Sequence, residues 1–370
     1  VGALPVSNWI RVSARLGALF ATMAVMALAA LVCAVSYQAI NGYFDFQLPL
    51  YFKGLFLIFL VQWLLLCVLS VFLQVLAGNR YLGTLLMVAV FVLNEVLPET
   101  GLDHRLYLFS ELPGSSWSDM NGYGHFGPAL AWFQTYWSIF AAILAVLATL
   151  LWVNGRDRRP GVRLKLLARR MTGRPAATLT VLSLLFILTG SWIFYNTNVL
   201  NEYQTSKDIR RIAADYERTY GIYDGVPQPK VVAAAMEVEI YPNERKVDIG
   251  GRLTLVNKSD APVDSLHMNI VRALDRTDLA ISGSTHAGGP DRKATIEARA
   301  LLDDRDLGCR IYSLSPPLCP GDTLYVDLDL GIEEKGFMNG RTNLRLVENG
   351  TFFSNMDYIP SIGYDPAREI

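Results

Sequence analysis

The chain has 370 residues, enough for two folding units, and its formal net charge is −1. A mean hydropathy of +0.27 is high for a soluble protein of this length. The only dense basic run lies between apolar stretches, where it indicates membrane topology or contact with anionic lipid, and we expect no nucleic-acid partner. Because the chain opens at Val1 in mid-motif, we expect it to be a fragment.

Residues 1–15 predict a short amphipathic helix on the cytoplasmic surface of a membrane. Ser7 or Asn8 could cap a helix that begins after Pro5. Arg11 and Arg15 lie four residues apart and therefore on one side of that helix. This composition is typical of a helix that lies in a membrane interface.

Residues 16–153 contain four apolar segments that are long enough to cross a bilayer as helices. The segments cover about residues 16–37, 54–77, 81–97 and 128–153. Small residues in the first segment predict that it packs closely against other helices. The loop at 99–127 has a net negative charge, which favours the outer side of the membrane.

A fifth apolar segment covers residues 176–195, directly after a basic loop at 154–175. Lys and Arg favour the cytoplasmic side, so this span should run from inside to outside. Arg11, Arg15, Arg80 and the basic loop all fall on one side if the spans alternate. We therefore expect a multi-pass protein of the bacterial cytoplasmic (inner) membrane whose C-terminal part is extracytoplasmic (periplasmic).

The remaining chain predicts a helical linker over 196–229 and a β domain over 230–370. Ile209, Ile212, Ala213, Tyr216 and Tyr220 recur every three or four residues, which predicts an amphipathic helix over residues 206–220. From residue 230 the apolar period changes to two, with turn residues between the runs. Short alternating strands of this kind predict an antiparallel, sandwich-like domain. The expected fold class is thus an α-helical polytopic membrane domain of about five spans followed by an extracytoplasmic β domain.

No catalytic, cofactor-binding or metal-binding motif is evident in the chain. A zinc peptidase of the usual kind needs the H-E-x-x-H spacing, and the four histidines do not provide it. A P-loop for ATP and a serine nucleophile elbow are also missing. His104 and His125 with Asp103 and Asp119 offer a weak metal hypothesis; the glycines around His125 favour a re-entrant turn instead.

Asn94 and Glu95 lie near the outer end of the third span, where two interpretations stay open. An ionisable residue inside a bilayer is costly, which favours a lining of a substrate path. Alternatively, Glu95 reaches the water interface beside Pro98. In the β domain, Cys309 and Cys319 lie ten residues apart and could form a disulfide on the outer side, although spacing alone does not show whether they approach.

The N-terminal motif Leu4-Pro5-Val6-Ser7, followed by a basic helix and a span, resembles the cytoplasmic coupling helix of ATP-binding-cassette exporter permeases of the second type. The resemblance implies that a separate ATPase subunit, which would bind the ATP, docks here. It also implies a second permease half or a homodimer, and two spans before Val1. The residues expected to contact the ATPase are Val6, Ser7, Asn8, Trp9, Arg11 and Arg15.

Later motifs resemble large bacterial fusions in which permease spans precede a membrane-anchored zinc aminopeptidase of the gluzincin class. The resemblance implies that residues 230–370 correspond to the N-terminal β domain of that aminopeptidase, and that zinc would bind only in a catalytic domain beyond this chain. The motifs are Met120–Phe126, Phe194–Asn201, Ala214–Glu217, Gln228-Pro229, Asn349–Phe353 and Tyr358–Tyr364.

The expected function is therefore the permease portion of an exporter-like complex that carries a non-catalytic β domain. Membrane lipid, the ATPase and the second permease half are the expected partners. The alternative is a membrane-tethered zinc aminopeptidase whose spans serve mainly as an anchor, and a third possibility is a scaffold with neither activity. Five spans exceed what an anchor requires, which favours transport.

Overall fold

The computed structural model describes residues 6–119, 122–153, 166–286, 294–340, 345–348 and 350–369. The chain divides into two compact units. The helical unit comprises Val1–Ser116, Tyr123–Thr205 and Phe337–Thr342. The sheet unit comprises Trp117–Gly122, Ser206–Gly336 and Asn343–Ile370. Most of the basic loop, at 154–165, and the motif residues Met120, Asn121 and Asn349 lie outside the described residues.

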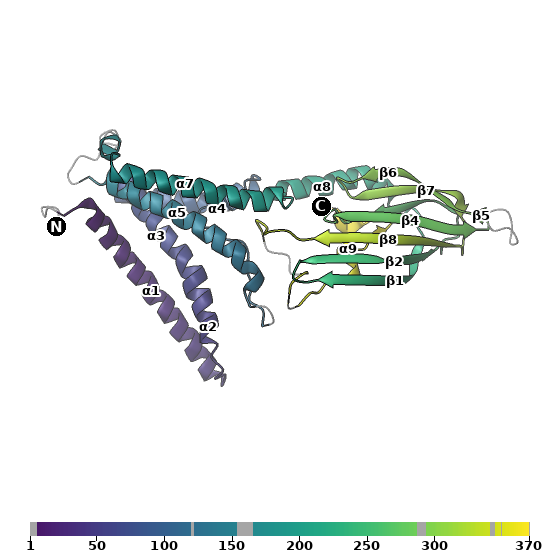
Figure 1. Cartoon of the computed structure of the whole chain (residues 1–370), viewed down its shortest axis with the longest axis horizontal. Helices are drawn as coiled ribbons and strands as arrows, with labels where there is room; N and C mark the ends of the chain where they lie inside the picture. Colours follow the sequence, from purple (N-terminus) through teal and green to yellow (C-terminus); the bar gives the residue numbers. More distant parts are fainter. Residues whose placement is uncertain are drawn as a thin grey trace. The chain divides into compact units, whose positions relative to one another are not determined.

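The described part of the helical unit contains five helices that are long and apolar enough to cross a membrane (Figure 1). This confirms the predicted helical region with five apolar spans. The five helices are α1 (Asn8–Ile40); α2 (Leu48–Tyr51), which continues through η1 (Phe52–Phe59) into α3 (Leu60–Ala77); α4 (Arg80–Glu99); η2 (Gly124–Phe126) with α5 (Gly127–Leu151); and α7 (Arg174–Phe194) with η3 (Tyr195–Val199).

Helix α1 is continuous across residue 15, where the sequence predicts a change from a surface helix to a span. Ser7 occupies the N-cap position of α1 without a capping side-chain hydrogen bond, and Asn8 is already helical. Among the described residues of α1, only Val12 is buried. The small residues of α1 therefore do not pack closely within this chain.

The helix ends that the sequence assigns to the cytoplasm gather at one end of the helical unit, here called the basic end. Val12 of α1 is fully buried there in one apolar cluster. Spans that cross a membrane in alternating directions would place these helix ends on the same side. The other buried members of the cluster are Val71 and Val75 of α3 and Ala148 and Leu151 of α5, and Leu167 packs against it.

Two side chains supply hydrogen bonds to the last carbonyl groups of α5, which have no partner within the helix. The Asn8 amide donates to the carbonyls of Thr149 and Trp152, at 3.2 and 3.1 Å. The Arg170 guanidinium donates to the carbonyls of Leu150 and Trp152, both at 2.8 Å. The start of α1 and the segment before α7 are thereby fixed to the end of α5.

The sheet unit is built from two antiparallel sheets, which confirms the predicted antiparallel β region. One sheet has the strand order β1-β2-β8-β4-β5 and the other β6-β7-β3-β9. The strands are β1 (Lys230–Tyr241), β2 (Lys246–Val256), β3 (Val263–Asn269), β4 (Arg276–Thr285), β5 (Ala294–Thr295), β6 (Glu297–Asp304), β7 (Cys309–Leu318), β8 (Thr323–Glu333) and β9 (Ser361–Ile362).

The core of the sheet unit follows the period of two on β2 and β8. Alternate residues of these strands are buried because successive side chains point to opposite faces. Leu330 is fully buried and pairs with Ile249 across the two strands. The opposite sheet contributes Leu266, Met268 and other apolar side chains to the same cluster.

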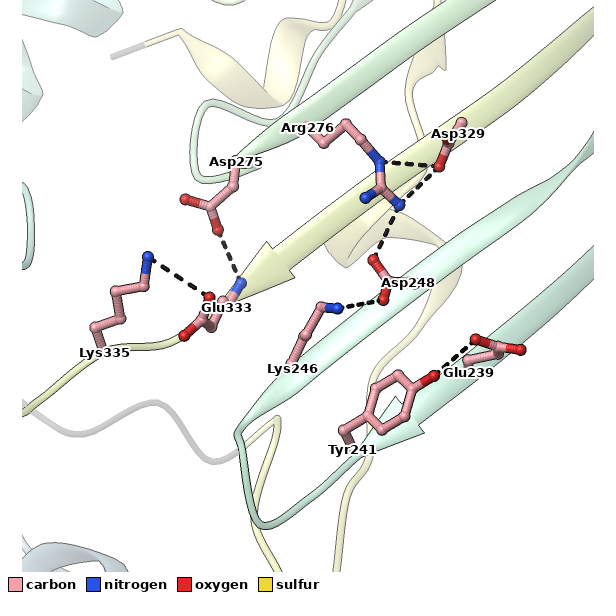
Figure 2. Close-up of polar contacts among 9 residues, drawn as sticks. All are labelled: Glu239, Tyr241, Lys246, Asp248, Asp275, Arg276, Asp329, Glu333 and Lys335. Atoms are coloured by element: carbon pink, nitrogen blue, oxygen red, sulfur yellow. Dashed lines mark hydrogen bonds and ion pairs between the residues drawn. The ribbon is translucent and has the colours of Figure 1, made fainter.

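The outer face of the larger sheet is polar and carries ion pairs between strands (Figure 2). Arg276 of β4 contacts Asp248 of β2 at 2.9 Å and Asp329 of β8 at 2.8 Å. Lys246 contacts the second oxygen of Asp248 at 2.7 Å. Ion pairs at the surface contribute little to stability because water screens them, so this face is suited to water and the core determines the fold.

Helix α8 (Ser206–Tyr220) forms where the sequence predicts it and covers part of the smaller sheet. Tyr216 is buried, donates to the Asn269 side chain of β3 at 3.0 Å and stacks on Tyr364. The Arg368 guanidinium lies over the Tyr216 ring. Short elements η4 (Gly221–Tyr223), α9 (Asn355–Tyr358) and η5 (Pro366–Arg368) complete the described part of the unit.

Leu330→Ala should lower the free energy of unfolding of the sheet unit by about 2–5 kcal/mol, because it leaves a cavity in a fully packed core. Leu301→Ala on β6 is the matched control, since Leu301 is 63 % exposed. Amide hydrogen exchange of β2 and β8, measured on the full chain in detergent, reports the change. Equal effects of the two substitutions would contradict the assigned core.

Candidate functional site

A pocket of about 480 Å³ opens in the helical unit between α3, α4 and the loop after α4. Such a volume is within the range of about 300–1,000 Å³ that is usual for small-molecule sites. The sequence-predicted residues Asn94 and Glu95 both line it. The full lining is Phe59, Gln62, Trp63, Leu66, Phe91, Val92, Asn94, Glu95, Val96, Phe109, Ser110 and Glu111.

The loop wall of the pocket is held by two amide side chains from the spans. The side-chain amide of Gln62 in α3 donates to the main-chain carbonyl of Ser110 at 3.0 Å. The Ser110 hydroxyl in turn donates to the main-chain carbonyl of Gln62 at 3.3 Å. Asn94 of α4 donates to the Phe109 carbonyl at 3.0 Å. These bonds satisfy loop carbonyls beside apolar helices, where an unsatisfied group would be costly.

Ser110 has a left-handed backbone with φ of 66°, which is uncommon for a residue other than glycine. Its side chain is buried, as are those of Leu108 and Phe109. The loop therefore turns inward onto the helices, and the contacts of Gln62 compensate for the unfavourable backbone angle. Strained residues of this kind are common at functional sites.

The two carboxylates of the pocket, Glu95 and Glu111, are exposed and come from α4 and the loop. Within the described part of the chain, no basic residue lines the pocket. The pocket combines an acidic part with aromatic and aliphatic walls. Glu95 lies in the last two turns of α4 and lines the pocket, and its role in a substrate path stays a prediction.

A buried polar network lies at the same end of the helical unit, here called the loop end because it carries residues 100–116. His104 is 3 % exposed. Its Nδ1 accepts from the Leu106 backbone amide at 3.2 Å, so Nε2 carries the proton and contacts the side chains of Thr197 and Asn198, each at 3.1 Å. His104 therefore connects the loop to the end of the last span.

Burial lowers the pKa of His104 below its ordinary value, since a charged imidazolium would be poorly solvated. The hydrogen bond to Asn198 and the charge of Asp103 oppose this lowering, and the nearby Arg105 adds to it. Burial raises the pKa of Tyr203, and the hydrogen bond that its hydroxyl donates to Asp103 raises it further. At neutral pH the ring of His104 is uncharged.

Arg105 fixes a segment from much later in the chain, Phe337–Gly340, in the helical unit. Its guanidinium donates to the carbonyls of Leu112 and Asn339, both at 2.7 Å, and its backbone amide donates to the Asn339 side chain at 3.0 Å. Phe337 packs against Phe133 of α5 with ring centroids 6.4 Å apart. Both Asn339 and Phe337 are buried. The segment that follows β8 in sequence is thus part of the loop end.

The residues proposed for ATPase docking divide into two groups. Asn8 is engaged with the carbonyls at the end of α5, and Arg15 stacks on the Trp152 ring at 4.5 Å. Arg11 and Val6 are partly buried, and Ser7 is exposed. Trp9 is 60 % exposed. The structure therefore gives Asn8 and Arg15 roles inside this chain and leaves Trp9 on the surface.

The disulfide hypothesis for Cys309 and Cys319 is wrong for this fold, because both thiols are free. Cys309 begins β7 and Cys319 follows its last residue. Cys309 pairs with Asn269 at one end of β3, and Leu318, next to Cys319, pairs with Val263 at the other end. The six residue steps between those partners span roughly 20 Å, whereas the Cα atoms of a disulfide lie within about 7 Å of each other. Cys309 is buried, which raises its pKa to about 11.

No group of three His, Cys, Asp or Glu side chains is placed to hold a metal ion within the described ranges. His104, one of the residues in the metal hypothesis, is engaged with Thr197 and Asn198 instead. A scan against protein-family models finds no match, and no curated protein is similar in sequence. The resemblance to exporter permeases and aminopeptidases therefore stays a prediction.

Sequence reasoning missed Gln62, Ser110 and the segment Phe337–Gly340. A signal for Gln62 was present, since it is a polar amide within an otherwise apolar span. The position of Asn339 has no local signal, because its partner Arg105 lies 234 residues away.

Lowering the pH from 7.5 to 5.5 should weaken hydrogen-exchange protection at residues 104–112. The neutral His104 ring stabilises the fold above its ordinary pKa of 6.5, and this contribution is lost as pH falls through that value toward the lowered pKa of the folded state. Exchange should be compared at each pH with a His104→Gln variant, which keeps an amide donor and does not titrate.

The pH dependence should be smaller in His104→Gln than in the parent chain. Exchange is measured only at residues 104–112 because burial also lowers the pKa of His267. His267 lies in the sheet unit, and its titration would change a measurement of the whole chain. The same pH dependence in both chains would show that His104 is not the titrating group.

Proposed function

We propose that the helical unit is part of an exporter-type permease that works with a separate ATPase subunit. The observation that carries the proposal is that polar side chains of two spans hold one loop against a pocket. Gln62 of α3 and Asn94 of α4 both donate hydrogen bonds to carbonyls of that loop. A helix that serves only as an anchor needs neither several spans nor a pocket with polar groups between them. The spans that contain α3 and α5 are the most buried of the five described spans, as expected for helices that pack together inside a membrane domain, and this supports the same proposal.

We further propose that the basic end faces the cytoplasm in a bacterial inner membrane. Arg11, Arg15, Arg80 and Arg170 belong to segments assigned to that side, and cytoplasmic loops are rich in Arg and Lys. The last span would then deliver the sheet unit to the outside. The charged outer sheet face is compatible with an aqueous compartment.

The exposed face of α1 is suited to contact another permease half. Apart from Val12, no described residue of α1 is buried, although the helix contains many small residues. Small residues allow close approach between helices in lipid. A second permease half, or a second copy of this chain, is the proposed partner for that face, with lipid covering the remainder.

For the ATPase, Trp9 and its neighbour Ile10 form the proposed contact. They are 60 % and 54 % exposed, and large apolar residues on the surface are typical anchors of protein interfaces. Val12, one turn away, is fully buried. Deleting residues 8–15 would therefore disturb the helical unit itself, so surface substitutions give the cleaner test.

The double variant Trp9→Ala/Ile10→Ala should reduce the amount of ATPase subunit that co-purifies with the chain by about tenfold or more, as expected for the loss of an interfacial aromatic anchor. Leu184→Ala/Leu188→Ala on α7 is the matched control, because those side chains are similarly exposed, lie mid-span and are away from α1.

The control should retain the ATPase. Failure of the parent chain to co-purify any ATPase from its native membrane would contradict the permease proposal. Equal loss in both double variants would contradict only the docking site.

A further inference from the structure

We propose that the pocket between α3, α4 and the loop binds a cationic amphiphile, a molecule with an ammonium headgroup on an apolar chain. This inference rests on the proposed function, because it names the class of substrate that the permease would take. Seven of the twelve lining residues are apolar, and the pocket reaches surface-exposed side chains such as Trp63 and Val92. An apolar chain fits this part.

The polar groups of the pocket select the headgroup. Gln62 and Asn94 are engaged with the carbonyls of Ser110 and Phe109, so their amide donors are directed to the loop. The carboxylates of Glu95 and Glu111 form no ion pair within the described residues. They remain as the groups available to a ligand, and both carry negative charge.

The nearby cation Arg105 offsets only part of the charge of the two carboxylates. Arg105 lies close enough to interact electrostatically with Glu111, but its guanidinium donates to the carbonyls of Leu112 and Asn339 and does not line the pocket. An anionic or phosphate-bearing headgroup would be repelled by two carboxylates, whereas an ammonium group is attracted by them and by aromatic rings.

The aromatic side chains strengthen this assignment. Phe59, Trp63 and Phe91 come from the two helices, and Phe109 comes from the loop. Quaternary ammonium groups are attracted to the faces of aromatic rings. The carboxylates and the rings therefore favour the same headgroup.

The test uses the full chain in nanodiscs of the uncharged lipid digalactosyldiacylglycerol, which carries no ammonium group, and a hexadecyltrimethylammonium probe with a photoreactive diazirine in its alkyl chain. Two probes with the same chain but a sulfate or a maltoside headgroup serve as comparisons. Saturable labelling of peptides that contain residues 59–66 and 91–96 is expected with the trimethylammonium probe alone.

The variant Glu95→Gln/Glu111→Gln should raise the half-saturating probe concentration about tenfold, because two attractive charges are lost. Asp45→Asn is the matched control: it removes one exposed acid from the loop between α1 and α2, away from the lining, and should leave labelling unchanged.

Labelling that is independent of the headgroup, or unchanged in the double variant, would overturn the proposal. The assay needs neither ATPase nor transport, so its outcome is separate from that of the permease proposal. Selective labelling without a co-purifying ATPase would support the pocket and contradict the permease. Co-purification of an ATPase without selective labelling would support the permease and contradict the pocket proposal.

Discussion

The structure depends on one constraint: backbone carbonyls that lie next to apolar helices need hydrogen-bond donors, because hydrocarbon offers none. At the basic end, Asn8 and Arg170 meet this need for the last turn of α5. At the loop end, Gln62 and Asn94 meet it for Ser110 and Phe109. These bonds join residues that lie between 15 and 141 positions apart in the sequence. They determine where the loop folds, and the position of the loop in turn forms the pocket.

The segment Phe337–Gly340 extends the same principle to the C-terminal half of the chain. It follows β8 in sequence but packs within the helical unit, where Asn339 satisfies both the backbone and the guanidinium of Arg105. His104, the neighbour of Arg105, connects the same loop to the end of α7. The loop thus contacts the last span and the segment that follows β8.

Length and period were sufficient to predict the five apolar helices, α8 and the antiparallel sheets, since each is a local pattern. The alternating runs in the sequence correspond to β1, β2, β3 and β8, and the other strands were not identified. Pro316 and Pro317 interrupt the period of β7, and β6 is exposed along most of its length. Asn94 and Glu95 were predicted for a substrate path and do line a pocket. Gln62 was missed although a polar amide within an apolar span is a local signal. Asn339 was missed because its partner Arg105 lies 234 residues away and leaves no local pattern. The Cys309–Cys319 bridge was wrong because the two residues lie at opposite ends of one strand.

Sidedness is the central claim, and cysteine accessibility tests it most directly. The four native cysteines would be replaced, and a single cysteine introduced by Thr172→Cys at the basic end or Arg305→Cys in the turn after β6, both exposed positions. We expect a membrane-impermeant maleimide to label Arg305→Cys in spheroplasts, and Thr172→Cys only after the membrane is permeabilised. Labelling of Thr172→Cys in sealed spheroplasts while Arg305→Cys stays protected would contradict the proposed orientation.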